Sequence, residues 1–212
     1  MIFCSKSSVL KLLVLLTLTQ FFVACKQDPP YIATSEMDGV VDDSLHVENN
    51  AGLYFNKALS SDGLNVEVKT SGNDELKHLS LDVALDGKVA IKKTLTIDGT
   101  IVDAMMADLN KDGKQEVYVF NQSAGSGSYG QLFAFQMDGN RMDSIILDEL
   151  PTKYLDQYMG HDSFDLQGKH LIRVFPLYHE MDPNCCPTGG MKKLKYKLVK
   201  HSGELRLVLD NS

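Results

Sequence analysis

The stretch that decides the fold spans residues 108–135 and reads DLNKDGKQEVYVFNQSAGSGSYGQLFAF. Its two apolar segments, 117–121 and 132–135, are rich in β-branched and aromatic residues and predict strands. Both segments are apolar at consecutive positions, as expected for strands covered on both faces. An acidic loop precedes the first strand, and a Gly/Ser-rich loop joins the two. Because rigid strands hold loop side chains in place, we expect the functional site in these loops.

Outward from this stretch, short segments alternate apolar and polar residues with a period of two, for example at 64–69 and 79–85. Asp-Gly pairs between segments accept the positive φ of a tight hairpin turn. One helix is expected at 151–159, with Pro151 at its first position and Gly160 as its stop. About ten short strands and one short helix predict a mainly β fold, an antiparallel β-sandwich or barrel.

The N-terminus resembles a bacterial lipoprotein signal. Lys6 and Lys11 accompany a long apolar run, which ends at the small residue Ala24 immediately before Cys25. We therefore expect cleavage before Cys25 and a lipid anchor on this cysteine. An N-terminal transmembrane helix is the alternative, since the run is nearly long enough to span a bilayer.

This interpretation divides the chain into three parts. Residues 1–24 form the signal peptide, residues 25–50 the lipidated cysteine and a flexible polar linker, and residues 51–212 a β-rich domain. The expected location is the bacterial cell envelope, at the periplasmic face of the outer membrane or at the cell surface.

The expected mature chain is acidic. The full sequence carries a net charge of −7, and cleavage removes two lysines and no acidic residue, so the charge becomes −9. An acidic domain is a poor binder of nucleic acid, and we expect no nucleic-acid partner. The charge suits a basic partner or bound cations, although solubility alone also explains it.

Oxygen-bearing side chains recur through the acidic loop at Asp108, Asn110, Asp112 and Glu116, which are loop positions one, three, five and nine. This spacing is similar to that of calcium loops, so calcium is the candidate cofactor, and no other is expected. The other interpretation is an ordinary turn, in which the side chains bond nearby backbone amides. Two lysines within the loop favour the turn.

Patterns typical of catalysis are weak. The six histidines are scattered, and none has metal-ligand spacing on an evident helix. Ser126 and Ser128 do not lie in a strand–turn–helix nucleophile elbow. We expect the protein not to be an enzyme.

Cys185 and Cys186 are the two cysteines left in the expected domain, after Cys4 in the signal and the lipidated Cys25. Adjacent Cα atoms lie ~3.8 Å apart, below the separation of about 4.4 to 6.8 Å in ordinary disulfides. A bridge between them is therefore strained. Since free thiols in an oxidising compartment persist mainly when buried, the pair forms either a vicinal disulfide or a buried thiol pair.

Four segments together resemble the periplasmic inhibitors of invertebrate-type lysozyme. They are residues 108–135, GHDSF at 160–164, RVFPLY at 173–178 and DPNCCPTGG at 182–190. The resemblance covers roughly residues 103–198. Earlier residues share only the β pattern with this family, and the lipid anchor and long linker are departures from it.

The resemblance implies a lysozyme as protein partner. In that family a Ser-Gly-x-Tyr loop enters the lysozyme cleft and meets the catalytic acids, and the matching residues here are Ser126, Gly127, Ser128 and Tyr129. Glycines in this loop would let the backbone enter without a Cβ clash. Alternatively, the loop is flexible and Tyr129 folds back onto the core.

A second class of function remains open beside inhibition. A calcium-stabilised module of the cell envelope would bind glycan or protein, with the Gly/Ser-rich loop serving only as a connection. The sequence leaves open the class of lysozyme, the membrane leaflet and the oligomeric state.

Overall fold

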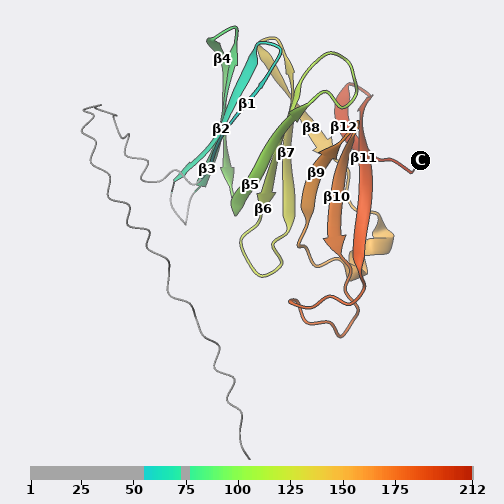
Figure 1. Cartoon of the computed structure of the whole chain (residues 1–212). Coiled ribbons are helices and arrows are strands. Elements are labelled where there is room, and N and C mark those ends of the chain that lie inside the picture. The colour runs from blue at the N-terminus through green and yellow to red at the C-terminus, as the bar shows by residue number, and fades with distance from the viewer. Residues whose placement is uncertain (1–54, 73–76, 212) are drawn as a thin grey trace, which may run out of the picture. The chain divides into compact units, whose positions relative to one another are not determined.

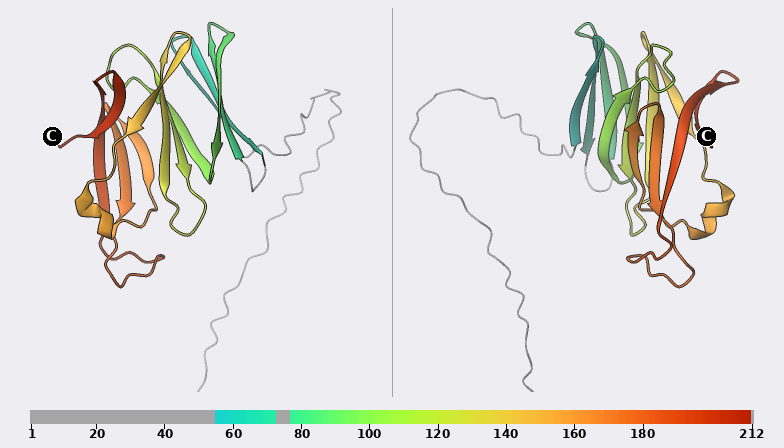
Figure 2. Two further views of the ribbon diagram at one scale, coloured as in Figure 1. Left: turned by 180° about the vertical axis from the view of Figure 1, so that it is seen from behind. Right: turned by 45° about the vertical axis from the view of Figure 1, so that its right-hand side comes forward.

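The computed structural model describes residues 55–72 and 77–211, which fold into two β-sheets (Figures 1 and 2). The four-stranded sheet consists of β1 (Phe55–Ser61), β2 (Leu64–Gly72), β3 (Lys77–Leu85) and β4 (Lys88–Ile97). The eight-stranded sheet consists of β5 (Thr100–Ala107), β6 (Glu116–Gln122), β7 (Gly130–Asp138), β8 (Arg141–Leu147), β9 (Ser163–Gln167), β10 (His170–Pro176), β11 (Met191–His201) and β12 (Glu204–Leu209). The predicted mainly β fold is confirmed.

The four-stranded sheet is an antiparallel meander in chain order. Its tight turns follow the predicted chemistry, because Asp62-Gly63 and Asp86-Gly87 all have positive φ. A two-residue turn with positive φ at both positions matches the right-handed twist of the strands that it joins. The Asp-Gly pairs therefore set where these hairpins reverse.

The eight-stranded sheet curves into a nearly closed, barrel-like form. Its strand order is β5-β6-β7-β8-β12-β11-β10-β9. Neighbouring strands are antiparallel except for β8 and β12, which pair in parallel through Leu205 with Ile145 and Leu207 with Leu147. A parallel pair requires a crossover, and here the chain passes through β9, β10 and β11 before it returns as β12.

Strand β6 supplies side chains to two hydrophobic cores. Val117 and Val119 pack with the four-stranded sheet in the first core, and Tyr118 and Phe120 point into the second core, within the eight-stranded sheet. All four side chains are buried. Each contributes about 1.5 to 3 kcal/mol of burial free energy, which explains why this strand is apolar at consecutive positions.

The predicted helix at 151–159 is shorter and tighter than expected. The structure has a 3₁₀ helix, η1 (Thr152–Gln157), with no buried residue, and Tyr158 is already extended. Tyr154 packs against Phe175 of the second core with ring centroids 6.3 Å apart, but no residue of η1 is fully buried. This packing is too little to stabilise a longer α-helix, because most helical stability in proteins comes from a packed apolar face.

The predicted signal peptide, Cys25 and the linker lie outside the described residues. Within the described part of the chain, no helix is long and apolar enough to cross a membrane.

Candidate functional site

The two loops predicted to carry function lie at opposite ends of the eight-stranded sheet. The Asp loop (residues 108–116) leads into the start of β6, and the Ser-Gly loop (residues 123–130) joins the end of β6 to β7. The seven residues of β6 separate them by roughly 20 Å at ~3.3 Å per residue. The structure therefore does not bring the calcium candidate and the Ser-Gly-Ser-Tyr motif into one site.

The Ser-Gly loop closes on itself through the side chain and backbone of Ser123. The Ser123 amide donates to the carbonyl oxygen of Tyr129 at 2.9 Å, and the Tyr129 amide donates to Ser123 Oγ at 3.0 Å. The Ser128 amide also donates to the Gly125 carbonyl at 3.3 Å. These bonds fold the motif into a compact turn rather than an open hairpin loop.

Two of the loop glycines are required by packing inside this chain. A Cβ on Gly127 would meet the ring of Tyr129, and a Cβ on Gly130 would meet the Asp162 side chain. Gly125 instead has open space beside it and a φ of +109°, which few residues other than glycine adopt. Contacts within this chain thus explain why residues 127 and 130 are glycines. The sequence had suggested that these glycines let the loop enter a partner.

A buried carboxylate, Asp162, holds the C-terminal end of the Ser-Gly loop. Its Oδ2 accepts the Gly130 amide at 2.9 Å and the Tyr158 hydroxyl at 2.5 Å, and its Oδ1 accepts Arg173 Nε at 2.6 Å. The Asp162 side chain is fully buried and that of Arg173 nearly so. A charge taken out of water persists only with such compensation, so this end of the loop is firmly fixed.

Tyr158 joins the carboxylate to the motif. Its hydroxyl accepts a bond from Arg173 Nη2 at 2.8 Å, while its ring lies edge-on to Tyr129 with centroids 5.6 Å apart. Burial, and then the hydrogen bond to Asp162, raises the pKa of Tyr158, which keeps the hydroxyl protonated as a donor.

The middle of the loop is fixed by two further residues. The His161 amide donates to the carbonyl oxygens of Gly127 at 2.8 Å and Ser128 at 3.2 Å. Asn184 Nδ2 donates to the Ser126 carbonyl at 2.7 Å from the Cys loop (residues 179–190). The Ser-Gly loop and the Cys loop lie at the same end of the eight-stranded sheet (Figures 1 and 2).

What the turn presents to solvent is small and polar, with one aromatic ring. Ser126 is exposed, Gly127 and Ser128 are half-buried, and the Tyr129 side chain is 45% exposed. The Tyr129 ring thus lies against Tyr158, Gly127 and Gly160, and a little under half of the side chain stays accessible. The arrangement can offer hydroxyl groups and one aromatic face to a narrow cleft.

Residues 67–153 match the PliI family. The family is described as the periplasmic lysozyme inhibitor of I-type lysozyme, and the match confirms the predicted resemblance. It supports a periplasmic lysozyme inhibitor with a lysozyme as protein partner. PliI is a family of inhibitors rather than enzymes, which is consistent with the expected absence of catalysis. No curated protein matches the chain.

The PliI match and the predicted resemblance cover different spans. The match begins at residue 67, before the expected start near 103, and ends at 153. It contains the Ser-Gly loop and the Asp loop. The groups that hold the Ser-Gly loop from outside, Asp162, Arg173 and Asn184, lie beyond it.

Sequence reasoning assigned no role to Asp162, Arg173 or Asn184. Each stands in one of the segments that resemble the inhibitors, and this was the one signal that pointed to them. Their function depends on long-range packing, because Asp162 and Asn184 lie 32 and 58 residues from their loop partners.

The Asp loop also lies within the PliI match, and its oxygens mostly bond its own backbone. Asp108 accepts the amides of Asp112 at 3.1 Å and Gly113 at 2.9 Å, and Asp112 Oδ1 accepts the amide of Lys114 at 2.9 Å. Asn110 Oδ1 likewise accepts the Asp112 amide at 3.0 Å. These are the bonds that the ordinary-turn interpretation predicts.

Glu116 lies inside the protein, where its Oε2 accepts the Leu109 amide at 2.8 Å. Burial raises its pKa to about 7. One oxygen from each of Asp108, Asp112 and Glu116 nonetheless lies within 4.8 Å of the others, a spacing that a cation can bridge.

Cys185 and Cys186 are both exposed on the Cys loop. The buried thiol pair is therefore wrong, because the loop lies on the surface rather than under the core. The two Sγ atoms are 2.6 Å apart. The vicinal disulfide stays a prediction.

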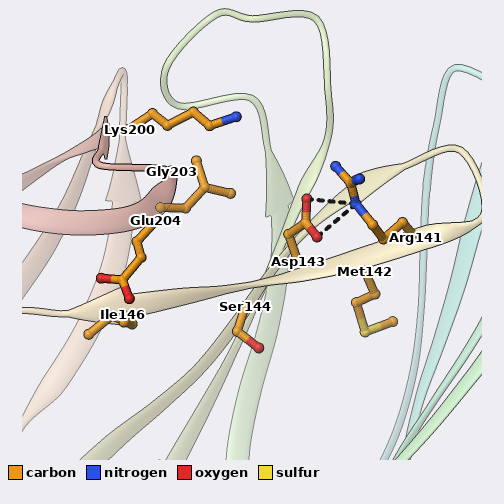
Figure 3. Close-up of a pocket in the computed structure, with 9 residues that line it drawn as sticks. Arg141, Met142, Asp143, Ser144, Ile146, Lys200, Gly203 and Glu204 are labelled. Carbon is orange, nitrogen blue, oxygen red and sulfur yellow. Dashed lines mark hydrogen bonds and ion pairs between the residues drawn. The ribbon is translucent and has the colours of Figure 1, made fainter.

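A shallow hollow between β8 and the β11–β12 hairpin lies at the other end of the sheet (Figure 3). Three of its charged groups are paired with nearby side chains, since Arg141 Nε pairs with Asp143 at 2.9 Å and Glu204 pairs with Arg206 at 3.4 Å. The hollow is far from the Ser-Gly loop and takes no part in the candidate site.

Proposed function

We propose that the protein is a non-enzymatic, lipid-anchored inhibitor that inserts the Ser-Gly loop into the active-site cleft of a secreted lysozyme. The observation that carries the proposal is the partly exposed Ser126–Tyr129 motif on a turn that is held by hydrogen bonds with His161, Asp162 and Asn184. The PliI match supports the lysozyme partner.

The motif suits the chemistry of that cleft. Lysozymes cut glycosidic bonds with two carboxyl groups, one of which is held protonated. The hydroxyls of Ser126 and Tyr129 can donate to the carboxylate and accept from the protonated acid. Tyr129 adds apolar contact area with little rotamer entropy to lose, as interface anchors do.

The hydrogen bonds that hold the turn in one conformation favour tight binding. Association costs free energy when a loop must be ordered, and a loop already fixed in its bound form avoids that cost. Here the C-terminal end of the loop is fixed by Asp162 and its middle by His161 and Asn184. We therefore expect little change in the turn on binding.

Charge favours the encounter. The mature chain expected after cleavage before Cys25 carries a net charge of −9, and we expect the lysozyme partner to be basic. Opposite net charges raise the association rate, and added salt lowers it.

The test is titration of the purified protein against invertebrate-type, chicken-type and goose-type lysozymes in a cell-wall lysis assay. We expect inhibition of at least one class. Folded protein that protects against none of them would overturn the proposal.

Replacement of Tyr129 by alanine in the same assay tests the role of the motif. We expect Tyr129→Ala to weaken inhibition by about 100-fold or more, as loss of a central aromatic anchor does. The melting temperature should hardly change, because the Tyr129 side chain is 45% exposed and belongs to neither hydrophobic core. Full inhibition by Tyr129→Ala would show that Tyr129 is not part of the contact with lysozyme.

The lipid anchor on Cys25 is a separate part of the proposal. It rests on the lipoprotein-like signal, which ends at this cysteine. Cys25→Ala should move the protein from the membrane fraction to the soluble fraction of the cell envelope and abolish labelling by radioactive palmitate. Unchanged labelling of the variant would rule out this site.

The second candidate function is a calcium-stabilised envelope module that binds glycan or protein. The observation in its favour is the spacing of Asp108, Asp112 and Glu116, with one oxygen from each within 4.8 Å. The two candidates differ in their response to calcium removal.

A further inference from the structure

Most of the exposed apolar side chains belong to segments at the same end of the eight-stranded sheet as the Ser-Gly loop (Figure 1). Nine large hydrophobic side chains are exposed among the described residues, and five of them belong to the Ser-Gly loop, to residues 151–162, or to the Cys loop with the first residue of β11. These five are Tyr129, Leu155, Met159, Met181 and Met191. Single exposed apolar residues are normal on proteins, but a concentration at one end marks an interaction surface.

Met181, on the Cys loop, is the most exposed of these side chains. It is 90% exposed, against 45% for Tyr129 and 37% for Met159. A methionine side chain is flexible and polarisable, so it adapts to irregular apolar surfaces on a partner.

The exposure of Met181 does not come from a frayed loop. Asp182, the next residue, accepts the amides of His179 and Thr188, both at 2.8 Å, and the Thr188 hydroxyl. The base of the loop is closed by the Leu177 amide, which donates to the Gly190 carbonyl at 2.8 Å. The Cys loop is therefore ordered by its own hydrogen bonds, and this ordered loop holds Met181 in solvent.

Direct bonds fix the Cys loop beside the Ser-Gly loop. Asn184 Nδ2 donates to the Ser126 carbonyl at 2.7 Å, and the Tyr178 hydroxyl donates to the Asn184 carbonyl at 2.9 Å. The Tyr178 amide also donates to the Gln157 carbonyl at 2.9 Å, which ties in the segment that carries Leu155 and Met159. A partner that receives Ser126 therefore meets the Cys loop at the same time.

We infer that the Cys loop is a second contact element for the same lysozyme, with Met181 packed against an apolar part of the cleft rim. The inference rests on the proposed function and adds a partner surface to it. Since the two loops are already joined, the second contact adds affinity without a further cost of ordering.

The experiment measures the dissociation constant of the inhibited lysozyme for three proteins. They are the wild type, Met181→Ser, and the control Val89→Ser. Val89 is 72% exposed on β4 in the four-stranded sheet, so both changes remove a well-exposed apolar side chain. Both variants should have the same melting temperature as the wild type, because neither side chain is in the core.

We expect Met181→Ser to weaken binding by about tenfold and Val89→Ser to leave it unchanged. Equal affinities for all three proteins would overturn the second contact and leave lysozyme inhibition intact. A wild type that inhibits no lysozyme would overturn the proposed function, and this inference with it.

Discussion

At the scale of single residues, three segments meet at the carboxylate of Asp162. It bonds Gly130 of the Ser-Gly loop, Tyr158 after the 3₁₀ helix and Arg173 of β10. The Arg173 guanidinium also lies 5.2 Å from the Tyr158 ring centroid and 5.6 Å from that of Phe164, so aromatic faces surround the ion pair. The shape of the loop therefore depends on a charge buried beneath it.

Replacement of Asp162 by asparagine should be strongly destabilising. The change leaves the Arg173 charge buried without its partner, which costs about 3 kcal/mol or more in the free energy of unfolding. Urea unfolding measures this loss. Tyr158→Phe is the matched control, because it removes one hydroxyl from the same network and should cost only about 1 kcal/mol. Equal stability of Asp162→Asn and the wild type would contradict the account.

Glu116 should make stability fall as the pH rises. Burial raises its pKa from 4.5 in the unfolded chain to about 7 in the folded one, so the folded state binds the proton more tightly. The free energy of unfolding therefore decreases between about pH 4.5 and pH 7, by at most about 3 kcal/mol from this group.

Glu116→Gln should remove that part of the pH dependence, because glutamine stays neutral throughout. Urea unfolding at pH 5 and at pH 8 measures it. The exposed Glu149→Gln is the control and should follow the wild type. If Glu116→Gln loses as much stability as the wild type between pH 5 and pH 8, the Glu116 carboxyl group does not cause the pH dependence.

At the scale of elements, strand β6 was predicted well from the sequence because each face of it meets a core. Consecutive apolar residues allow no other arrangement in a sheet. The parallel pairing of β8 with β12 was not predictable in this way, since it joins Ile145 to Leu205 across three intervening strands. The helix at 151–159 was overpredicted, because Leu155, which was expected on the packed face, is 52% exposed and no residue of η1 is fully buried.

The Asp loop shows that the sequence was also insufficient to predict a binding site. Its spacing of oxygens is equally typical of a calcium loop and of a turn, and the sequence does not decide between them. The structure shows Asp108 and Asp112 bonded to loop amides, which the turn requires, and close to Glu116, which an ion requires.

We expect no calcium response from the Asp loop, because its carboxylates are already satisfied by amides. Melting curves with millimolar calcium and with chelator should superimpose. A ligand bound only to the folded state raises the melting temperature by mass action, so a real site would separate the curves. If they separate, and Asp112→Ala abolishes the difference, the loop binds calcium.

At the scale of the whole molecule, the Ser-Gly-Ser-Tyr motif was recognised from the sequence, but the residues that hold it in place were not. The motif is four consecutive residues and is recognisable locally. Its support combines His161, Asp162 and Asn184, which the register of β9, β10 and β11 brings to the same end of the sheet. Local patterns do not specify such a register across the chain.

The central claim is that the Ser-Gly loop occupies the lysozyme cleft. The measurement that tests it most directly is the apparent dissociation constant of the complex at increasing concentrations of a chitooligosaccharide that fills the same cleft. The account predicts that the apparent constant rises in proportion to the sugar, because the two ligands exclude each other. A dissociation constant that stays the same while the sugar saturates the cleft would contradict it.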